Sequence, residues 1–185
     1  MILTFLKGFS WFLPRLYRTG PFASSANDPI KSRFSDASQA FTYKPWFKRI
    51  FNQLIQINPF ENSDGVCDGL STQYEKSQHG VHTILTAGPH PQDATGAQAP
   101  LIFGSNTIKS VRGCGGQMLS KIDYSVNTDG SQPLSCGTDD YGPGFDAYPI
   151  QMARNQCTFS YMSGTTVSDN NGDRFLSNLY FYWKC

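Results

Sequence analysis

The chain of 185 residues has few charged side chains and no long apolar run. Asp, Glu, Lys and Arg make up 16% of it, against about 25% in an average globular protein. No stretch approaches the roughly 18 to 20 apolar residues that a membrane-spanning helix needs. The length suits one domain with an extension. These features disfavour a conventional single-pass membrane protein and a charge-rich, helical cytosolic enzyme.

The sequence also lacks the short motifs that mark common catalytic and cofactor sites. It contains no phosphate-binding loop, dinucleotide fingerprint, nucleophile elbow or H-E-x-x-H zinc motif. None of its five cysteines forms a C-x-x-C pair, which argues against a zinc ribbon or a thioredoxin-type site. We therefore expect a non-catalytic protein without a cofactor.

The charge of the chain is divided unevenly between its two parts. Residues 1–60 carry eight Lys or Arg and two acids, whereas residues 61–185 carry seven basic and twelve acidic residues. Such a division is expected when one part contacts an anionic partner and the other faces water. The alternative is a solvated basic arm that has no partner.

Apolar residues of the first eighteen positions recur at steps of three and four, which is the spacing of one helical face. A linker rich in Gly, Pro and Ser follows and is expected to be extended chain. Pro45 then suits the first position of a helix, and Asn58-Pro59 would stop it. This pattern predicts an amphipathic helix at about 45–57.

We predict that residues 1–60 form a basic amphipathic docking segment for a membrane surface or a larger assembly. Aromatic side chains would enter the partner while basic side chains attract it. A mitochondrial transit peptide is an alternative for the first thirty residues, because acids are absent before Asp28. The predicted docking residues are Phe5, Phe9, Trp11, Phe12, Arg15, Arg18, Trp46, Phe47, Lys48, Arg49 and Phe51.

Residues 61–185 show short β-prone runs separated by turn dipeptides, at spacings typical of sandwiches and barrels. The final hairpin is the clearest element, because two alternating aromatic strands flank Asn171-Gly172. We predict a mainly β fold, with α+β as an option: an antiparallel β-sandwich or jelly-roll-like domain after the helix and arm. The expected strands cover residues 81–86, 100–103, 107–112, 121–126, 148–153, 156–162 and 175–183.

All of the cysteines lie in this acidic part of the chain, at Cys67, Cys114, Cys136, Cys157 and Cys185. Their wide spacing suits disulfides between distant strands, so four of them would form two bridges in an oxidising compartment. Cys185 is the candidate for the odd cysteine, and Cys114, in a glycine turn, is expected to be bridged. Reduced, buried thiols in a cytosolic fold are the alternative.

Few side chains suggest a metal site, and we expect the protein to bind no metal ion. The three histidines crowd within twelve residues, but a strand would place His79 and His82 on opposite faces. Acidic turns near residues 139–146 and 169–173 do not match a calcium loop. The candidates for metal ligands are His79, His82, His90, Asp139 and Asp140.

The sequence thus predicts a non-catalytic structural or accessory subunit of a virion, a surface filament or a membrane complex. Its partners would be other protein subunits or a membrane, with a homo-oligomer as an option and no nucleic acid. We expect an oxidising compartment, a virion or a cell surface, with mitochondria as the alternative. Two other functions remain open: a ligand- or glycan-binding β module that uses aromatic residues and acidic loops, and a small cysteine enzyme around Cys114.

Overall fold

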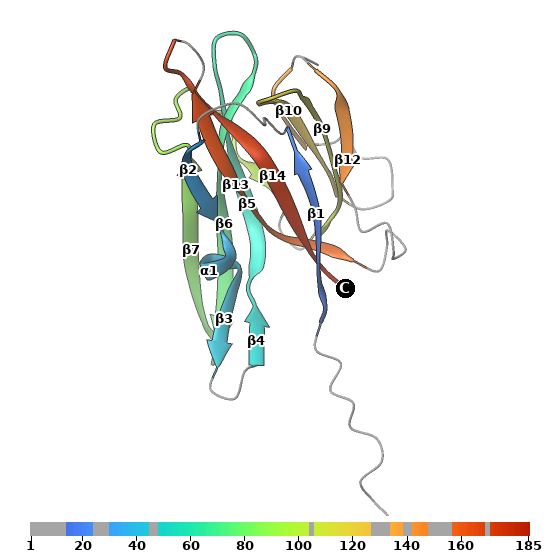
Figure 1. The fold of residues 1–185 in the computed structure, drawn as a ribbon. Coiled ribbons are helices and arrows are strands. Elements are labelled where there is room, and N and C mark those ends of the chain that lie inside the picture. Colours follow the sequence, from blue (N-terminus) through green and yellow to red (C-terminus); the bar gives the residue numbers. More distant parts are fainter. Residues whose placement is uncertain are drawn as a thin grey trace, which may run out of the picture.

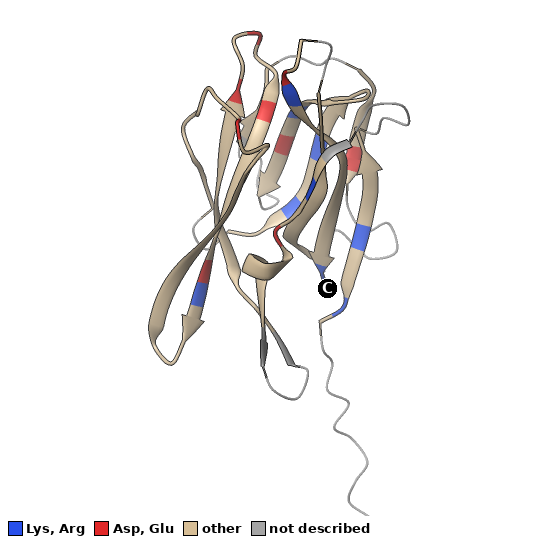
Figure 2. Cartoon of the chain, turned by 60° about the vertical axis from the view of Figure 1, so that its left-hand side comes forward, with Lys and Arg blue, Asp and Glu red and all other residues tan. Residues whose placement is uncertain are grey.

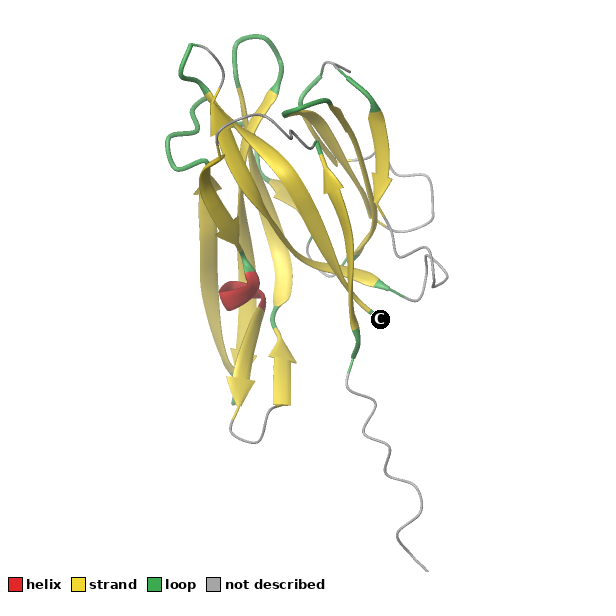
Figure 3. Cartoon of the chain, viewed as in Figure 1, coloured by secondary structure: helices red, strands yellow, loops and turns green. Residues whose placement is uncertain are grey.

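The computed structural model describes residues 14–23, 30–44, 48–103, 106–126, 134–138, 142–147, 157–168 and 171–185. Within these ranges the chain is almost entirely β-strand, with one short helix, α1 (Ala37–Ala40) (Figure 3). Twelve strands form three four-stranded sheets and two more form a separate hairpin, with antiparallel pairing throughout. The prediction of a mainly β, antiparallel fold is confirmed, although three sheets replace the two of a sandwich or jelly roll.

Each sheet is named here by its strand order. Sheet I has the order β1 (Leu16–Phe22), β14 (Arg174–Lys184), β13 (Thr158–Ser168), β2 (Ile30–Ser35). Sheet II has the order β7 (Val81–His90), β6 (Cys67–Gln78), β5 (Gln53–Glu61), β8 (Leu101–Ile102). Sheet III has the order β11 (Leu134–Cys136), β10 (Leu119–Val126), β9 (Ile108–Gly115), β12 (Gly144–Ala147). The hairpin consists of β3 (Phe41–Lys44) and β4 (Lys48–Phe51).

The three sheets surround one hydrophobic core, like the sides of a prism (Figure 1). Trp183 and Phe181 of sheet I are fully buried in it, together with Leu70 of sheet II and Ile122 of sheet III. Burying one such side chain stabilises a fold by roughly 1.5–3 kcal/mol. Because every sheet contributes, no sheet has an independent core of this size.

The predicted strands agree with the structure where it describes them. The runs at 81–86, 121–126 and 175–183 lie in β7, β10 and β14 respectively. The runs at 100–103, 107–112 and 156–162 overlap strands in part: residues 101–102 form β8, residues 108–112 lie in β9, and residues 158–162 lie in β13. The final hairpin forms as expected, with Ser168 opposite Arg174 and Gly172 at a φ of +92° in the turn. The run at 148–153 lies outside the described residues.

The helix predicted at about 45–57 is wrong: this part of the chain contains β4 and β5. A register shift between Leu54 and Gln56 interrupts the pairing of β5 with β6. Such a bulge lets Leu54 and Ile57, three residues apart, both pack on the core. The spacing of three therefore imitates a helical face, while pairing with distant strands decides the outcome.

The described residues between 16 and 60 belong to the β fold. β1 pairs with β14 and β2 pairs with β13, so the strands nearest the start of the chain flank the last hairpin. β5 continues across the predicted boundary at residue 60. Phe22 and Phe34 pack against the shared core. Of the aromatic residues predicted to dock, Phe51 alone is described, and it packs against a second, smaller core cluster that includes Phe41. The docking role of the others stays a prediction.

Two disulfides form, as predicted; one joins distant strands, and the other joins the ends of the neighbouring strands β13 and β14. Cys67 bonds to Cys136 and links sheet II to sheet III, and Cys157 bonds to Cys185 at the end of β14. The odd cysteine is Cys114, which keeps its thiol within β9, so the assignments of Cys185 and Cys114 were wrong. Disulfides persist in oxidising environments such as extracellular and secretory compartments.

In the part of the chain that the structure describes, no helix has the length and apolar character needed to cross a bilayer.

Candidate functional site

Three connections meet at one end of the prism and enclose a pocket of about 510 Å³ (Figure 1). They are the β5–β6 turn, the β7–β8 connection and the β13–β14 turn. We call this cavity the end pocket. Its lining is mainly polar, with side chains of Glu61, Asn62, Ser63, Asp64, Asp68, Asp93, Thr95, Asp173 and Arg174.

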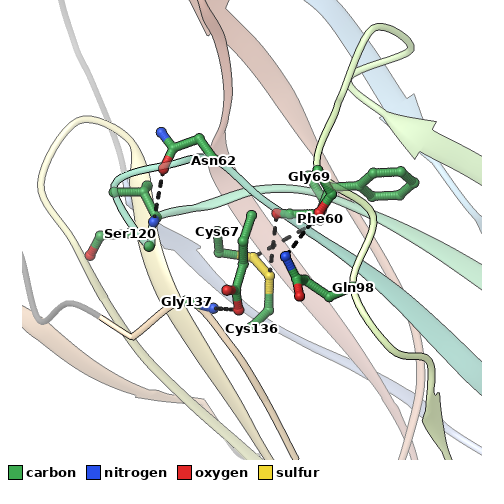
Figure 4. Close-up of a disulfide and its surroundings, with 12 residues drawn as sticks. Phe60, Asn62, Cys67, Gly69, Gln98, Ser120, Cys136 and Gly137 are labelled. Atoms are coloured by element: carbon green, nitrogen blue, oxygen red, sulfur yellow. Dashed lines mark hydrogen bonds between the residues drawn. A yellow bond between two sulfur atoms is a disulfide. The ribbon is translucent and has the colours of Figure 1, made fainter.

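The β5–β6 turn is fixed by its own side chains and by a disulfide. The Asn62 side-chain oxygen accepts hydrogen bonds from the backbone N–H groups of Asp64 and Val66, both at 3.0 Å. Below the turn, the Cys67–Cys136 disulfide links β6 to β11 (Figure 4). The backbone N–H of Gly137 donates to the Glu61 carboxylate at 2.7 Å. Sheet III thereby supports this wall of the end pocket.

The β7–β8 connection lies close against sheet II because two glycines allow the approach. Gly96 has a φ of +71°, and its carbonyl accepts a hydrogen bond from the Glu61 N–H at 3.1 Å. A Cβ at this position would clash with the Glu61 carbonyl oxygen. On β6, a Cβ at Gly69 would lie 2.7 Å from the Ala94 side chain. Glycine is therefore required for the connection to reach the pocket.

Carboxylates dominate the charge of the end pocket. Asp64, Asp68, Asp93 and Asp173 line it together with Glu61, whereas Arg174 is the one basic residue among the described lining. Figure 2 shows several acidic positions at this end of the chain. The Arg174 guanidinium lies 3.3 Å from the Asp93 carboxylate. Both side chains are about half exposed, so this ion pair is weak. The described lining thus carries five acidic side chains and one basic side chain.

The acidic lining of the end pocket affects the pKa of Asp68. Burial raises the pKa of its carboxyl group, and the negative charges of Asp173 and Asp93 add to the increase. A backbone hydrogen bond from Thr95 acts in the opposite direction. The three aspartates therefore lie close enough to interact, although they come from one strand and two different connections.

The chemistry of the end pocket suits a neutral ligand rich in hydroxyl groups. Ionised carboxylates only accept hydrogen bonds, and a polyol offers many donors. A ligand carrying carboxylates or phosphates would be repelled by the aspartates. The described lining includes no histidine or cysteine, so it offers no imidazole base or thiol nucleophile.

The predicted docking residues are dispersed. Arg15 exchanges backbone hydrogen bonds with Cys185, and the Arg18 guanidinium lies over the Tyr180 ring at 4.8 Å. Phe51 packs edge-on against Phe41 in the smaller core cluster. Lys48 and Arg49 are the first two residues of β4. The remaining ones, Phe5, Phe9, Trp11, Phe12, Trp46 and Phe47, lie outside the described residues.

The histidines do not converge on a metal. His79 lies in the exposed β6–β7 turn, His82 bonds to Glu75 at 2.6 Å, and His90 is directed elsewhere, toward Asp36. No group of three or more His, Cys, Asp or Glu is arranged for a metal ion in the described ranges. Asp139 and Asp140 lie outside those ranges.

A buried carboxylate that the sequence did not reveal holds two sheets and α1 together. Asp36 is fully buried, accepts a hydrogen bond from the Thr72 hydroxyl at 2.7 Å and lies 3.0 Å from His90 Nε2. The His90 ring stacks on Phe34 at 4.2 Å. Buried ionised groups are tolerated only with such partners. This cluster is closed to solvent on the Asp36 side and acts as a structural connection.

The residues of the end pocket were largely missed by sequence analysis. The acidic turn at 169–173 was noted, but Asp68 and Asp93 stand twenty-five positions apart with no local motif. Only the pairing of β6 with β7 brings their segments together. The structure gives no support to a cysteine enzyme, which would need a histidine base beside Cys114. Cys114 lies in sheet III, whereas the histidines belong to sheet II or its turns.

No protein-family model and no curated protein sequence matches the chain. By structure it is similar to the Calsepa lectin in complex with a biantennary N-glycan, with 14% identity, a TM-score of 0.56, and 92% of this chain and 97% of that chain covered. It is also similar to a prostate-specific WGA16 glycoprotein lectin, with 16% identity, a TM-score of 0.54, and coverages of 90% and 97%. PirB matches with 12% identity and a TM-score of 0.52, over 78% of this chain and 32% of that one. At these identities the similarity shows a shared fold.

Proposed function

We propose that this protein is a non-catalytic glycan-binding module and that the end pocket binds the sugar. The observation that carries the proposal is the acidic, hydroxyl-accepting pocket formed by three connections at one end of the prism. The same fold occurs in the Calsepa and WGA16 lectins. The glycan-binding alternative therefore has more support than the subunit that docks to a membrane or assembly.

The ligand class follows from the charges of the pocket. Asp68 and Asp173 accept hydrogen bonds from sugar hydroxyl groups, and Asn62 and Thr95 add neutral polar groups at the rim. Sialylated or sulfated glycans are disfavoured because their anionic groups would approach several carboxylates. We therefore infer a preference for neutral glycans.

A glycan array on the full chain, with both disulfides intact, tests the proposal. Neutral glycans should bind, and calorimetric titration of the best one should then be repeated with Asp173→Asn and Asp68→Asn. Losing a hydrogen bond to a charged acceptor costs about 1.5–3 kcal/mol, so each variant should bind at least about tenfold more weakly. Asp146→Asn is the matched control, because Asp146 lies on β12 and contacts Arg112 at 3.6 Å.

Two results would contradict the proposal. The first is binding to no neutral glycan, and the second is an equal loss of affinity in the Asp146 control. Because paired carboxylates also hydrolyse glycosides, the release of reducing sugar should be measured as well. Turnover that disappears in Asp68→Asn would identify an enzyme rather than a binding module. Docking through Phe5, Phe9, Trp11 and Phe12 stays a prediction.

A further inference from the structure

β7 forms an outer edge of sheet II and carries exposed apolar side chains. In the described chain its one strand neighbour is β6 (Figure 1). Val81 is 64% exposed and Ile84 is 52% exposed, although both lie in a regular strand. An exposed, apolar strand edge offers unpaired backbone groups to another strand.

The other sheet edges carry the features that protect against such pairing. β1 includes Arg18 and Pro21, and β2 includes Lys31 and Arg33. β8, β11 and β12 are four residues long or shorter. By contrast, the one proline of β7 is Pro89, beyond the regular part of its pairing, and residues 81–88 contain no Asp, Glu, Lys, Arg or Pro. β7 is therefore the one long edge in the described chain that is left open to pairing.

The backbone of β7 is regular enough to serve as a template. Its register with β6 continues without a shift from Gln78 opposite Val81 to Thr72 opposite Ala87. The two-residue turn makes the first of these a hydrogen-bonded pair, so every second residue of β7 bonds to β6. The alternate residues are His82, Ile84 and Thr86. Their backbone N–H and C=O groups point away from β6, toward the open edge of the sheet.

We propose that two copies of this chain pair antiparallel through β7, about a two-fold axis at Ile84. Sheet II would then continue as one eight-stranded sheet across the dimer. Ile84 lies opposite Ile84 of the second copy, and His82 lies opposite Thr86. All three are outward-bonding positions, so the hydrogen-bond pattern of the edge is self-complementary.

The charges near this edge permit the pairing. Glu75 neighbours Ile84 on β6 and lies 2.6 Å from His82 of its own chain. In the dimer the two Glu75 residues are separated by three strand spacings, about 14 Å, which exceeds a Debye length of about 8 Å in physiological salt. Like charges are therefore not opposed, whereas the two Ile84 side chains gain an apolar contact.

Sedimentation velocity of the full, oxidised chain over a range of concentrations tests this interface. The protein should form a dimer, and Ile84→Lys should raise the dissociation constant of the dimer by at least about tenfold. Ile102→Lys is the matched control, because Ile102 is 65% exposed on β8 at the opposite edge of the same sheet. This control should dimerise as the wild type does.

Cross-linking tests the register independently. Residues in a hydrogen-bonded antiparallel pair have Cα atoms about 5.5 Å apart, a separation that a disulfide spans. With Cys114 replaced by Ser in both proteins, Ile84→Cys should form a covalent dimer under mild oxidation and Ile102→Cys should not. Three results would overturn the proposal: a monomer at all concentrations up to about 100 μM, a dimer that Ile84→Lys leaves intact, or equal cross-linking of both cysteine variants. None of them bears on whether a single end pocket binds a glycan.

Discussion

The two disulfides allow stability and binding to be separated in one experiment. Cys67–Cys136 closes 69 residues and lies beneath the end pocket, whereas Cys157–Cys185 closes 28 residues near the C-terminus (Figure 4). Loop-closure entropy gives about 4.4 kcal/mol for the first bridge and about 3.6 kcal/mol for the second. Replacing either pair with serine should therefore lower stability by a similar amount, equivalent to roughly 8–16 °C in Tm.

Only the first replacement should change ligand binding. The Cys67–Cys136 bridge links β6, which follows the β5–β6 turn, to β11. The backbone N–H of Gly137, beside Cys136, donates to the Glu61 carboxylate in the pocket wall. Without the bridge, the β5–β6 turn has more conformational freedom. Ordering the turn on binding then costs more conformational entropy, so the affinity for a neutral glycan should fall. The Cys157–Cys185 pair lies near Arg15, at the other end of the prism.

Guanidinium denaturation and calorimetric titration measure the two effects, at a temperature where circular dichroism shows both variants folded. The serine pair at 157 and 185 is the control for a general loss of rigidity. A loss of less than about 1 kcal/mol in the free energy of unfolding on replacing Cys67 and Cys136 would contradict the loop-closure prediction. The binding prediction is refuted if both replacements weaken glycan binding equally.

Other substitutions test single contacts. Asp36→Ala should lower the free energy of unfolding by about 1–3 kcal/mol, because the buried Thr72 hydroxyl and the partly buried His90 ring lose their carboxylate partner. Asp146→Ala on the surface should lower it by at most about 1 kcal/mol; equal losses in denaturation would refute this. Gly96→Ala should unfold at lower temperature than Gly80→Ala, since both positions have positive φ but only the first meets the Glu61 carbonyl. Burial raises the pKa of Asp68, so its ionisation disfavours the folded state, and the stability of the wild type relative to Asp68→Asn should rise as the pH falls from 7 toward 3.8. Because the described residues group no metal ligands, EDTA should leave glycan affinity unchanged.

The dimer proposal bears on how a glycan-binding module would work. In the proposed function, one end pocket per chain would offer a single weak contact to a surface covered with sugars. Two pockets on one dimer would bind such a surface with higher avidity without any new contact. Ile84→Lys should then reduce binding to immobilised glycans more than it reduces binding to a free monosaccharide, which calorimetry measures.

The sequence by itself determined the β class, the final hairpin and the capacity for two disulfides. These features are local or compositional: alternating aromatic residues around Asn171-Gly172, few charges, and cysteines too dispersed for a metal knuckle. The same local signals were misleading at 45–57. There a bulge in β5 placed Leu54 and Ile57 on one face and imitated a helix.

Tertiary structure decided the remainder, because the deciding contacts are distant in sequence. β1 meets β14 across most of the chain, and this pairing places Tyr17 and Phe22 against the shared core. Likewise Asp68, Asp93 and Asp173 share no motif and become one pocket only when three connections close the end of the prism. The sequence gives the order of the side chains, but non-local strand pairing determines which of them are in contact.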